Sequence, residues 1–353
     1  MSRTAGAVAA AAGAVALCAY IVRSRLRRNS PQGEQVQVQR GKELARLRSM
    51  IAMEVPESIM SCIVAHRGFH STDDHSDVRP TENTLSAYEQ AWASGVRLCE
   101  CDVAITADDQ VVLCHDENFE RLALRVPGFD AERSSNTGLL TFSQLVALPL
   151  LSGQRPPLLA EVLESARAIG SGSLLVIEVK QGNDAAPAAL CRLFAARPEL
   201  VAHVAIVMSF DAPIMHNIRS LFRSSLGHLA SLPKLLLLVL AARGPVESRV
   251  ADLARKGFKF FDVDTPPSTA DWLERATETG ESTRLDGLYI QYQPQMLSPA
   301  GLDKMRALSK AMTVGVWGFA DLDPDNLYTA QKLIHDAGAT FVNTDLPRDF
   351  ALG

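Results

Sequence analysis

The chain has 353 residues, of which 47% are hydrophobic and 21% are charged. These proportions exclude a disordered polar protein, and the length fits one α/β domain of the kind that reaches roughly 250 residues or more. The formal net charge is −5, which gives no general attraction to nucleic acid, because nucleic-acid-binding proteins usually present a basic face. We therefore predict no nucleic-acid partner.

An uncharged segment of 18 residues, Ala5–Val22, lies near the start of the sequence. As a helix it would measure roughly 27 Å, which is enough for a thin bilayer core. Four arginines follow it within residues 23–28, and the positive-inside rule then predicts that the rest of the chain lies in the cytosol. We therefore predict a hydrophobic anchor with a basic flank over residues 1–28, a polar linker over residues 29–58, and a membrane-anchored protein.

Two other interpretations of this segment stay open. No acidic residue precedes Glu34, so an N-terminal presequence that targets an organelle is the first alternative. A cleaved signal peptide fits less well, because its positive charges should precede the apolar run.

From about residue 59 to residue 353, short aliphatic runs alternate with helical periods. This alternation is typical of βα units around a parallel sheet, so we predict a single TIM-type (β/α)8 barrel domain. Helical periods cover Thr84–Ala93, Leu158–Ala168 and Leu322–Ala337. Ten candidate strands exceed the eight that such a barrel needs: Cys62–Ala65, Leu98–Ile105, Val111–His115, Leu174–Lys180, Val204–Ser209, Leu235–Leu240, Phe258–Val263, Gly287–Gln291, Thr313–Trp317 and Thr340–Thr344.

One pair of candidate strands is too close in sequence to be parallel. Only Thr106–Gln110 separates Leu98–Ile105 from Val111–His115, whereas parallel neighbours need a crossover of roughly a dozen residues. We therefore predict an antiparallel hairpin with its turn near Ala107–Asp109. Residues 117–157, which follow the His115-Asp116 pair, break the βα rhythm and are predicted to be a small insertion between barrel elements.

Charged side chains gather where the predicted strands end, which is where barrel enzymes build their sites. Glu100 and Asp102 are two residues apart on one strand, so both carboxylates point to the same face, and Cys99 and Cys101 point to the other. If the thiols pack against the outer helices, the acids face the barrel interior. Unpaired carboxylates there are tolerable only when a cation joins them.

The same parity places Glu178 and Lys180 on one face of a later strand. Three carboxylates with no cysteine or histidine among the ligands favour a hard divalent cation, Mg²⁺ or Ca²⁺.

These polar groups form an ordered set that resembles the signature of the glycerophosphodiester phosphodiesterase family. Each three-residue motif alone is weak, but five in order form a strong signal. The similarity extends from about Cys62 to Pro347 and includes the closing Asn343-Thr344-Asp345-Leu346-Pro347 segment. The motifs are H-R-G at 66–68, E-N-T at 82–84, E-x-D at 100–102, H-D at 115–116 and E-x-K at 178–180.

The resemblance implies a role for each matching residue. It implies one divalent cation held by Glu100, Asp102 and Glu178, with Glu82 as a further ligand or a partner of the ligands. It also implies His66 and His115 as the acid–base pair, without deciding which is which, and Arg67 and Lys180 as groups that contact the phosphate.

Other residues carry weaker expectations. Asp116 is a candidate for orienting its neighbours. Trp317, at a late strand end, is a candidate wall of the substrate pocket, with core packing as the alternative. His70 falls in the polar loop 70–77, which is predicted to be solvated.

The sequence departs from the family in two places. Residues 117–123 replace a threonine-rich run that ends R-T-T in the family, and residues 317–320 replace W-T-V-N. We interpret both changes as a loss of polar groups near the substrate rim, which puts the alcohol specificity in doubt.

The resemblance implies hydrolysis of a glycerophosphodiester to glycerol 3-phosphate and an alcohol. A lysophospholipase D that acts on lysolipids at a membrane is the close alternative. A phosphoinositide-type phospholipase C fits less well because of the insertion after His115-Asp116. The alternative of a different class is a catalytically silent scaffold, against which the complete set of acids and histidines argues.

Overall fold

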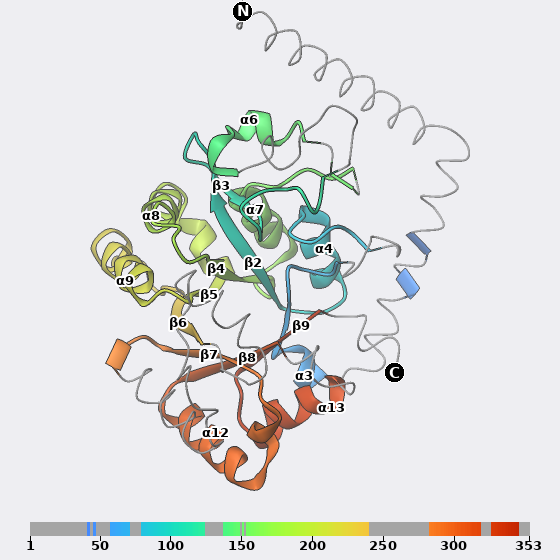
Figure 1. The fold of residues 1–353 in the computed structure, drawn as a ribbon, viewed down its shortest axis with the longest axis vertical. Helices are drawn as coiled ribbons and strands as arrows, with labels where there is room; N and C mark the ends of the chain where they lie inside the picture. Colours follow the sequence, from blue (N-terminus) through green and yellow to red (C-terminus); the bar gives the residue numbers. More distant parts are fainter. Residues whose placement is uncertain are drawn as a thin grey trace, which may run out of the picture.

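The computed structural model describes residues 41–42, 45–46, 57–70, 79–123, 137–148, 150–151, 153–239, 282–318 and 326–345. Its strands occupy the centre, and helices surround them on the outside (Figure 1). The strands are β1 Ile63–Ala65, β2 Leu98–Ile105, β3 Val111–Leu113, β4 Leu174–Val179, β5 Val204–Ser209, β6 Lys234–Val239, β7 Gly287–Gln291, β8 Thr313–Trp317 and β9 Phe341–Thr344.

The helices alternate with these strands along the chain. The α-helices are α3 Glu57–Met60, α4 Leu85–Ala93, α6 Phe142–Leu145, α7 Leu159–Ile169, α8 Ala186–Ala196, α9 Ala212–Leu226, α12 Pro299–Ala311 and α13 Asn326–Gln331. Short 3₁₀ segments are η1 Thr137–Leu139, η2 Pro198–His203 and η3 Pro294–Leu297, and a π-helical turn, η4, covers Lys332–Asp336.

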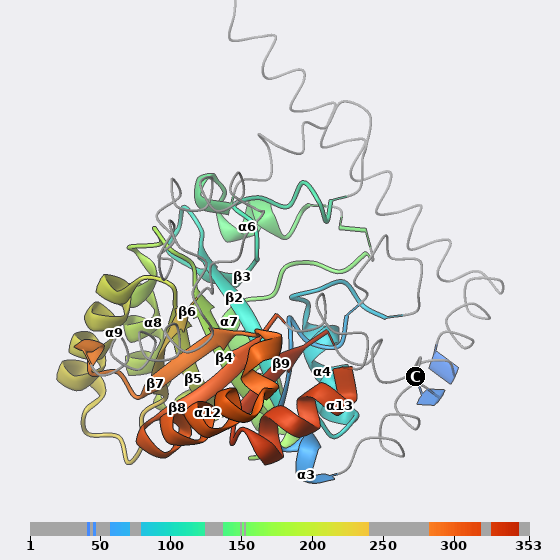
Figure 2. The ribbon, with the colours of Figure 1, turned by 60° about the horizontal axis from the view of Figure 1, so that its bottom comes forward.

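Eight parallel strands close into a barrel, which confirms the predicted TIM-type fold. Their order is β1-β9-β8-β7-β6-β5-β4-β2, and β1 also pairs with β2 to complete the ring. The view in Figure 2 shows α12 and α13 across β8 and β9, and α8 and α9 beside β5 and β6. Because all eight strands run the same way, their carboxyl ends meet at one mouth of the barrel.

The ninth strand is the antiparallel partner that the short connection requires. Strand β3 pairs with β2 in the register Val103↔Leu113 and Ile105↔Val111. Asp109 sits in the turn with a φ of 61°, a left-handed conformation that aspartate tolerates better than most residues. The predicted hairpin is therefore confirmed. The predicted strand Phe258–Val263 lies outside the described residues.

Two apolar layers separate the inside of the barrel from its outside. One cluster lies between the strands and the helices and contains Cys99, Cys101 and Ile177 together with Tyr88 of α4. A smaller cluster fills the barrel and includes Val64, Leu98, Val176, Met208, Leu236 and Tyr289. The predicted division of β2 into a face of thiols and a face of acids therefore matches the two sides of the sheet.

Part of the predicted insertion packs as a small cluster of its own. Val112 and Cys114 contact Phe119, Leu122, Leu145 and Leu150. An isolated antiparallel bridge joins Ala123 to Leu150. The boundaries at residues 28, 58, 117 and 157 remain predictions.

The expectation of a membrane-anchored protein with a cytosolic domain is corrected. A span needs about 20 apolar residues in one helix, and none of the helices among the described residues is long and apolar enough. The longest of these, α9, has 15 residues and carries Arg219 and Arg223. The segment Ala5–Val22, interpreted as an anchor or a presequence, lies outside the described residues.

Candidate active site

Three buried acids converge inside the barrel. Glu100 and Asp102 of β2 are each 1% exposed, and Asp102 is the register partner of Glu178 on β4. One carboxylate oxygen from each of the three residues lies within 4.8 Å of the other two. The even spacing on β2 and the parallel register with β4 bring them together, because side chains two apart share a face.

The donor set fits a divalent cation. Glu100 Oε1 is buried and has no hydrogen-bond partner among the residues that the structure describes. Burial raises the pKa of Glu100 well above its ordinary value, and the charges of Asp102 and Glu178 raise it further. Buried oxygens of this kind are left without compensation unless a cation or a proton joins them. Clustered carboxylates are the ligands that Mg²⁺ and Ca²⁺ prefer.

Lys180 supplies part of the positive charge that the acids need. Its Nζ lies 2.7 Å from Asp102 Oδ1 and 2.7 Å from Glu178 Oε1. Burial alone would raise the pKa of Asp102, but the charges of Lys180 and His115 lower it well below its ordinary range. The backbone N–H of Cys114 donates to the carbonyl oxygen of Asp102 at 3.0 Å, which holds the segment that carries His115 next to the strand of the acids.

His66 follows β1 and is held by a carboxylate from the other end of the chain. Its Nδ1 lies 2.6 Å from Asp345 Oδ1, and its Nε2 lies 4.0 Å from Glu100 Oε2. Asp345 comes directly after β9, and β9 pairs with β1 in the register Ala65↔Thr344. An ionised carboxylate only accepts hydrogen bonds, so Nδ1 carries the proton. The Nε2 atom of His66 is thereby left on the side of the acids.

The prediction that His70 lies in a solvated loop is wrong. His70 is 4% exposed. Its Nε2 lies 3.5 Å from Asp345 Oδ1, and its ring centroid lies 6.3 Å from that of His66 in an edge-on arrangement. His70 therefore packs against the His66–Asp345 pair. Residues 71–78 of the same loop lie outside the described residues.

The chain turns sharply after His66, and this turn aims Arg67 at the acids. Arg67 has a φ of 54°, and its backbone N–H donates to Glu100 Oε2 at 3.0 Å. Its Nη1 donates to Glu82 at 3.0 Å, and its Nε lies 3.5 Å from Asp102 Oδ2. Gly68 continues the turn with a φ of 82°, where a Cβ would lie 2.8 Å from the Ala87 backbone. Only glycine fits this close approach.

Glu82 lies with the arginines and outside the group of three acids. Its Oε1 accepts hydrogen bonds from Arg67 Nη1 at 3.0 Å and from Arg121 Nη2 at 2.7 Å. Its Oε2 accepts from Arg121 Nη1 at 2.7 Å. Burial alone would raise the pKa of Glu82, but these hydrogen bonds and the two guanidinium charges lower it to about 2. Glu82 is therefore placed to anchor the two arginines.

Arg121 was missed in the sequence because it is a lone arginine in the predicted insertion. The interpretation that residues 117–123 remove polar groups from the site is wrong. Arg121 contributes a guanidinium, and Leu122 and Ala123 are buried in the small cluster beside β3.

His115 has a carboxylate partner of its own. Its Nδ1 lies 2.7 Å from Asp116 Oδ1, and Arg121 Nε donates to Asp116 Oδ2 at 2.9 Å. The two histidines are similarly exposed, at 31% for His66 and 32% for His115. Each histidine therefore pairs with an aspartate through Nδ1 and remains partly open to solvent.

Asn83 belongs to the E-N-T motif, although the sequence assigns it no role of its own. Its Nδ2 donates to Asp102 Oδ2 at 2.9 Å, and its Oδ1 accepts from Tyr88 Oη at 2.6 Å. Asn83 has a φ of 52°, so two non-glycine residues of the site, Arg67 and Asn83, lie in the left-handed region. Such conformations are costly and cluster at functional sites.

Trp317 and Phe210 form an apolar pair at the ends of β8 and β5. Their ring centroids are 5.7 Å apart in an edge-on arrangement, and Trp317 Nε1 donates to the carbonyl of Tyr289 at 3.2 Å. Both rings pack on the cluster inside the barrel and remain partly exposed. They are therefore available as a wall of the barrel mouth.

The fold and the site together define a TIM-barrel protein with an acidic centre flanked by two histidine–aspartate pairs. Residues 66–216 match the model of the glycerophosphoryl diester phosphodiesterase family. This match contains the three acids and both histidines, whereas Trp317 and Asp345 lie beyond it.

Two curated proteins and two solved structures are similar to the chain. "Probable glycerophosphodiester phosphodiesterase 1" of Mycobacterium tuberculosis is 31% identical over 182 residues, which cover 44% of this chain and 59% of that protein. "Glycerophosphodiester phosphodiesterase" of Caldanaerobacter subterraneus is 34% identical over 125 residues, which cover 34% of this chain and 45% of that protein. The chain thus spans about half the length of the curated relatives it matches.

Solved structures resemble the whole barrel. A glycerophosphodiester phosphodiesterase from Agrobacterium tumefaciens has a TM-score of 0.52 at 19% identity, with 83% of this chain and 99% of that chain covered. A phosphodiesterase from Oleispira antarctica, solved with the product sn-glycerol-3-phosphate, has a TM-score of 0.50 at 17% identity, with 81% and 94% covered. These likenesses show the TIM-barrel fold, and the family match over residues 66–216 agrees with the motifs of the sequence.

Proposed function

We propose that the protein hydrolyses glycerophosphodiesters to glycerol 3-phosphate and an alcohol, with one divalent cation, Mg²⁺ or Ca²⁺. The observation that carries this proposal is the convergence of Glu100, Asp102 and Glu178, within 4.8 Å, beside His66 and His115. The product bound to the Oleispira antarctica relative is the one that this reaction releases.

Positive groups at the site neutralise the phosphate. The cation, when bound by the three acids, supplies charge that stabilises the phosphate oxygens and the developing negative charge. Arg67 and Lys180 lie against the same acids and contact the non-bridging oxygens. Both cations now contact carboxylates. A phosphate that enters the site replaces one negative partner of Arg67 and Lys180 with another.

The two histidines transfer the protons. In the route that the family resemblance implies, one histidine removes a proton from the glycerol hydroxyl, whose oxygen then forms a bond to phosphorus. The other histidine protonates the alkoxide as its bond to phosphorus breaks, which leaves a cyclic phosphate. Water then opens the cyclic phosphate with the roles of the histidines exchanged, and glycerol 3-phosphate is released. Imidazoles suit both steps because they gain and lose protons near neutral pH.

Asp345 and Asp116 act as positioning residues for the two histidines. Each accepts a hydrogen bond from Nδ1, at 2.6 Å for His66 and 2.7 Å for His115. Such a bond fixes the tautomer and leaves Nε2 as the atom that exchanges protons.

The apolar pair Phe210 and Trp317 favours a second candidate function, a lysophospholipase D. These rings come from the ends of β5 and β8, whereas the charged groups come from β1, β2 and β4. A substrate with an acyl chain would place its phosphate on the polar side and its chain on the rings.

A substrate panel with and without EDTA tests both functions. We expect the protein to release glycerol 3-phosphate from glycerophosphocholine, and to lose this activity in EDTA and in the His115→Gln variant. His228→Gln, which changes an exposed histidine outside the site, is the matched control and keeps the activity. Preference for lysophosphatidylcholine over glycerophosphocholine would favour the lysophospholipase D. Full activity in EDTA, or in His115→Gln, would exclude the proposed mechanism.

A further inference from the structure

A basic groove lies on the outer surface of the barrel, away from the acidic centre. His216, Arg219, Ser220, Arg223 and Ser224 of α9 line one side, and Ser282, Thr283 and Arg284, which lead into β7, line the other. Its volume is about 590 Å³, within the range of small-molecule sites. Residues 282–284 precede β7, so this groove lies toward the amino ends of the strands, opposite the mouth that holds the acids.

Three guanidinium groups, those of Arg219, Arg223 and Arg284, line this groove. Within the described ranges, no ion pair joins Arg219, Arg223 or Arg284 to an acid, whereas Arg192 and Arg197 on and beside the neighbouring α8 do pair with acids. The whole chain carries a net charge of −5, so this group of cations differs in sign from the net charge of the protein. Like charges this close repel one another, and an anion between them relieves that repulsion.

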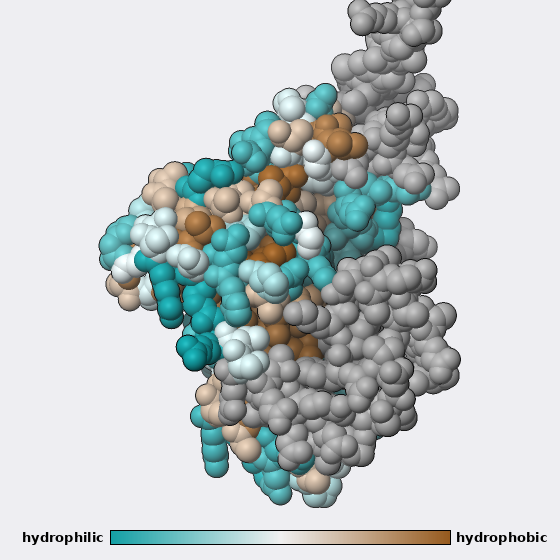
Figure 3. All heavy atoms as spheres, turned by 60° about the vertical axis from the view of Figure 1, so that its left-hand side comes forward, coloured by the Kyte–Doolittle hydropathy of each residue, from teal (hydrophilic) through white to brown (hydrophobic). Residues whose placement is uncertain are grey.

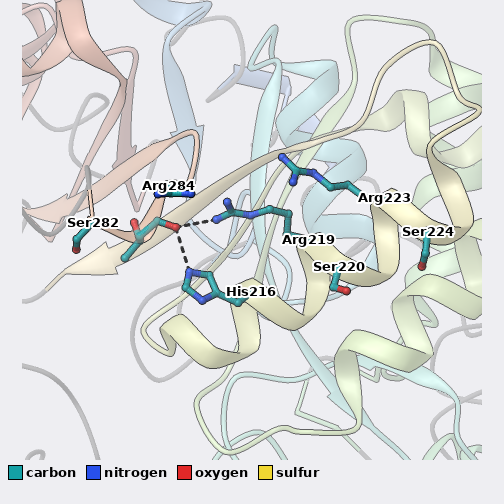
Figure 4. Close-up of a pocket in the computed structure, with 8 residues that line it drawn as sticks. His216, Arg219, Ser220, Arg223, Ser224, Ser282 and Arg284 are labelled. Atoms are coloured by element: carbon teal, nitrogen blue, oxygen red, sulfur yellow. Dashed lines mark hydrogen bonds between the residues drawn. The ribbon is translucent and has the colours of Figure 1, made fainter.

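The groove is held together by one backbone carbonyl. The oxygen of Thr283 accepts hydrogen bonds from His216 Nε2 at 3.0 Å and from Arg219 Nη2 at 2.9 Å (Figure 4). These two bonds fix the segment before β7 against α9. Arg219 has further N–H groups that this carbonyl does not use, because a guanidinium has five.

Arg284 adopts a backbone conformation that costs free energy. Its φ is 53°, and apart from the turn residue Asp109 the other described non-glycine residues with a positive φ are Arg67 and Asn83 of the candidate active site. A left-handed arginine persists only when its surroundings enforce it, and such residues concentrate at functional sites. Hydrophilic side chains are mixed with apolar ones on the described part of the face seen in Figure 3.

We propose that this groove is a second anion site, which binds a phosphorylated small molecule through its phosphate. Arginine forks bind phosphate with two parallel hydrogen bonds, and the dianion of a phosphomonoester satisfies more of three guanidinium charges than a single carboxylate does. The hydroxyl group of Ser220 lines the same groove and supplies a neutral donor. The binding is independent of catalysis, because none of the lining residues belongs to the acidic centre.

Protection from an arginine-specific reagent tests the site where it lies. The full chain is treated with phenylglyoxal, with and without inorganic phosphate or glycerol 3-phosphate, and the modification of each arginine is followed by mass spectrometry. At a phosphate concentration ten times the dissociation constant, about one site in eleven remains free. Modification of Arg219, Arg223 and Arg284 should therefore slow about tenfold. Arg192, exposed on α8 and paired with Asp109 at 3.3 Å, is the internal control and should not be protected.

The Arg223→Ser/Arg284→Ser double variant completes the experiment. We expect phosphate to lose its protection of Arg219 in this variant, with the melting temperature and the rate of diester hydrolysis unchanged. Equal protection by potassium chloride of the same ionic strength would show an ionic-strength effect only and would overturn the proposal. Protection confined to Arg67 would overturn it as well. Because the readout is residue-specific, its failure is separate from a failure of the proposed enzymatic function.

Discussion

At the scale of single residues, the site is a set of charged groups that hold one another in place. Asp345 fixes His66, Asp116 fixes His115, and Asn83 fixes Asp102. In each of these bonds, one residue has a proposed chemical role and its partner only positions it. The partners are therefore expected to affect turnover more than substrate affinity or stability.

The Asp345→Asn variant tests this expectation. Asparagine keeps the size of aspartate but lacks the charge that holds the Nδ1 proton of His66. We expect kcat to fall about 100-fold, at the lower end of what acid–base catalysis contributes, with KM changed less than about threefold. Steady-state release of glycerol 3-phosphate measures both constants. Asp303→Asn, on the exposed face of α12, is the matched control, and an unchanged kcat in Asp345→Asn would remove Asp345 from the mechanism.

Glu82 gives a prediction for the dependence of stability on pH. Its folded pKa of about 2 lies below the ordinary value of 4.5, so the folded protein favours the ionised form. The resulting stability is present above pH 4.5 and is lost as the pH falls from about 4.5 to 2. It amounts to at most about 3–4 kcal/mol, because each unit of pKa is worth about 1.4 kcal/mol.

Urea unfolding of the wild type and of Glu82→Gln in EDTA measures this contribution. The difference in unfolding free energy between the two proteins should be largest near pH 6 and should shrink as the pH falls toward 3. A difference that stays constant over this range would mean that the two arginines do not stabilise the ionised carboxylate.

The acids and histidines of the site follow from the sequence, which also makes Asp116 a candidate for orienting its neighbours. It does not predict the partners Asp345, Arg121 and His70. Strand parity joins Glu100 to Asp102, and the strand-end rule selects His66 and Lys180, so local pattern is sufficient for these residues. Asp345 is 279 positions from His66 and meets it only because β9 pairs with β1. Arg121 and His70 come from irregular segments, where no periodicity predicts the direction of a side chain.

At the scale of elements, close packing inside the barrel explains a glycine in β8. A Cβ on Gly315 would lie 2.1 Å from Cδ2 of Tyr289, whose ring is fully buried in the neighbouring strand β7. The absence of a Cβ at Gly315 thus leaves room for the Tyr289 ring within the barrel.

The Gly315→Ala variant should therefore destabilise the fold. We expect a loss of about 1–3 kcal/mol in unfolding free energy, the usual cost of overpacking a core. Gly172→Ala is the control, because a Cβ there meets nothing within 4 Å. Denaturant unfolding compares the two, and equal stability would mean that Tyr289 moves aside without cost.

The hairpin of β2 and β3 was predictable, and the end of the last helix was not. The short connection between Leu98–Ile105 and Val111–His115 leaves only an antiparallel pairing. The predicted helix Leu322–Ala337 is described from Asn326 as α13 followed by the π-helical turn η4. Apolar periodicity alone does not distinguish these two windings over so few residues.

At the scale of the whole molecule, the alternation of strands and helices predicts the barrel, because few arrangements bury both faces of a parallel sheet. The closure itself depends on pairing β1 with both β9 and β2, which no local pattern specifies. This closure brings His66, Asp345 and the acids of β2 to one mouth. The basic groove at the other end of the strands depends on the same closure, since α9 and the segment before β7 are distant in sequence.

The concentration of divalent cation that gives half-maximal activity tests the central claim most directly. Rates of glycerol 3-phosphate release from glycerophosphocholine are measured against Mg²⁺ or Ca²⁺ in the metal-free wild type, in Glu178→Gln and in the control Glu161→Gln, which changes a glutamate on α7 paired with Arg155. We expect Glu178→Gln to raise the half-maximal concentration about tenfold or more, since one of three charged ligands is lost. Glu161→Gln should match the wild type. The same cation dependence in all three proteins would contradict a metal site built from Glu100, Asp102 and Glu178.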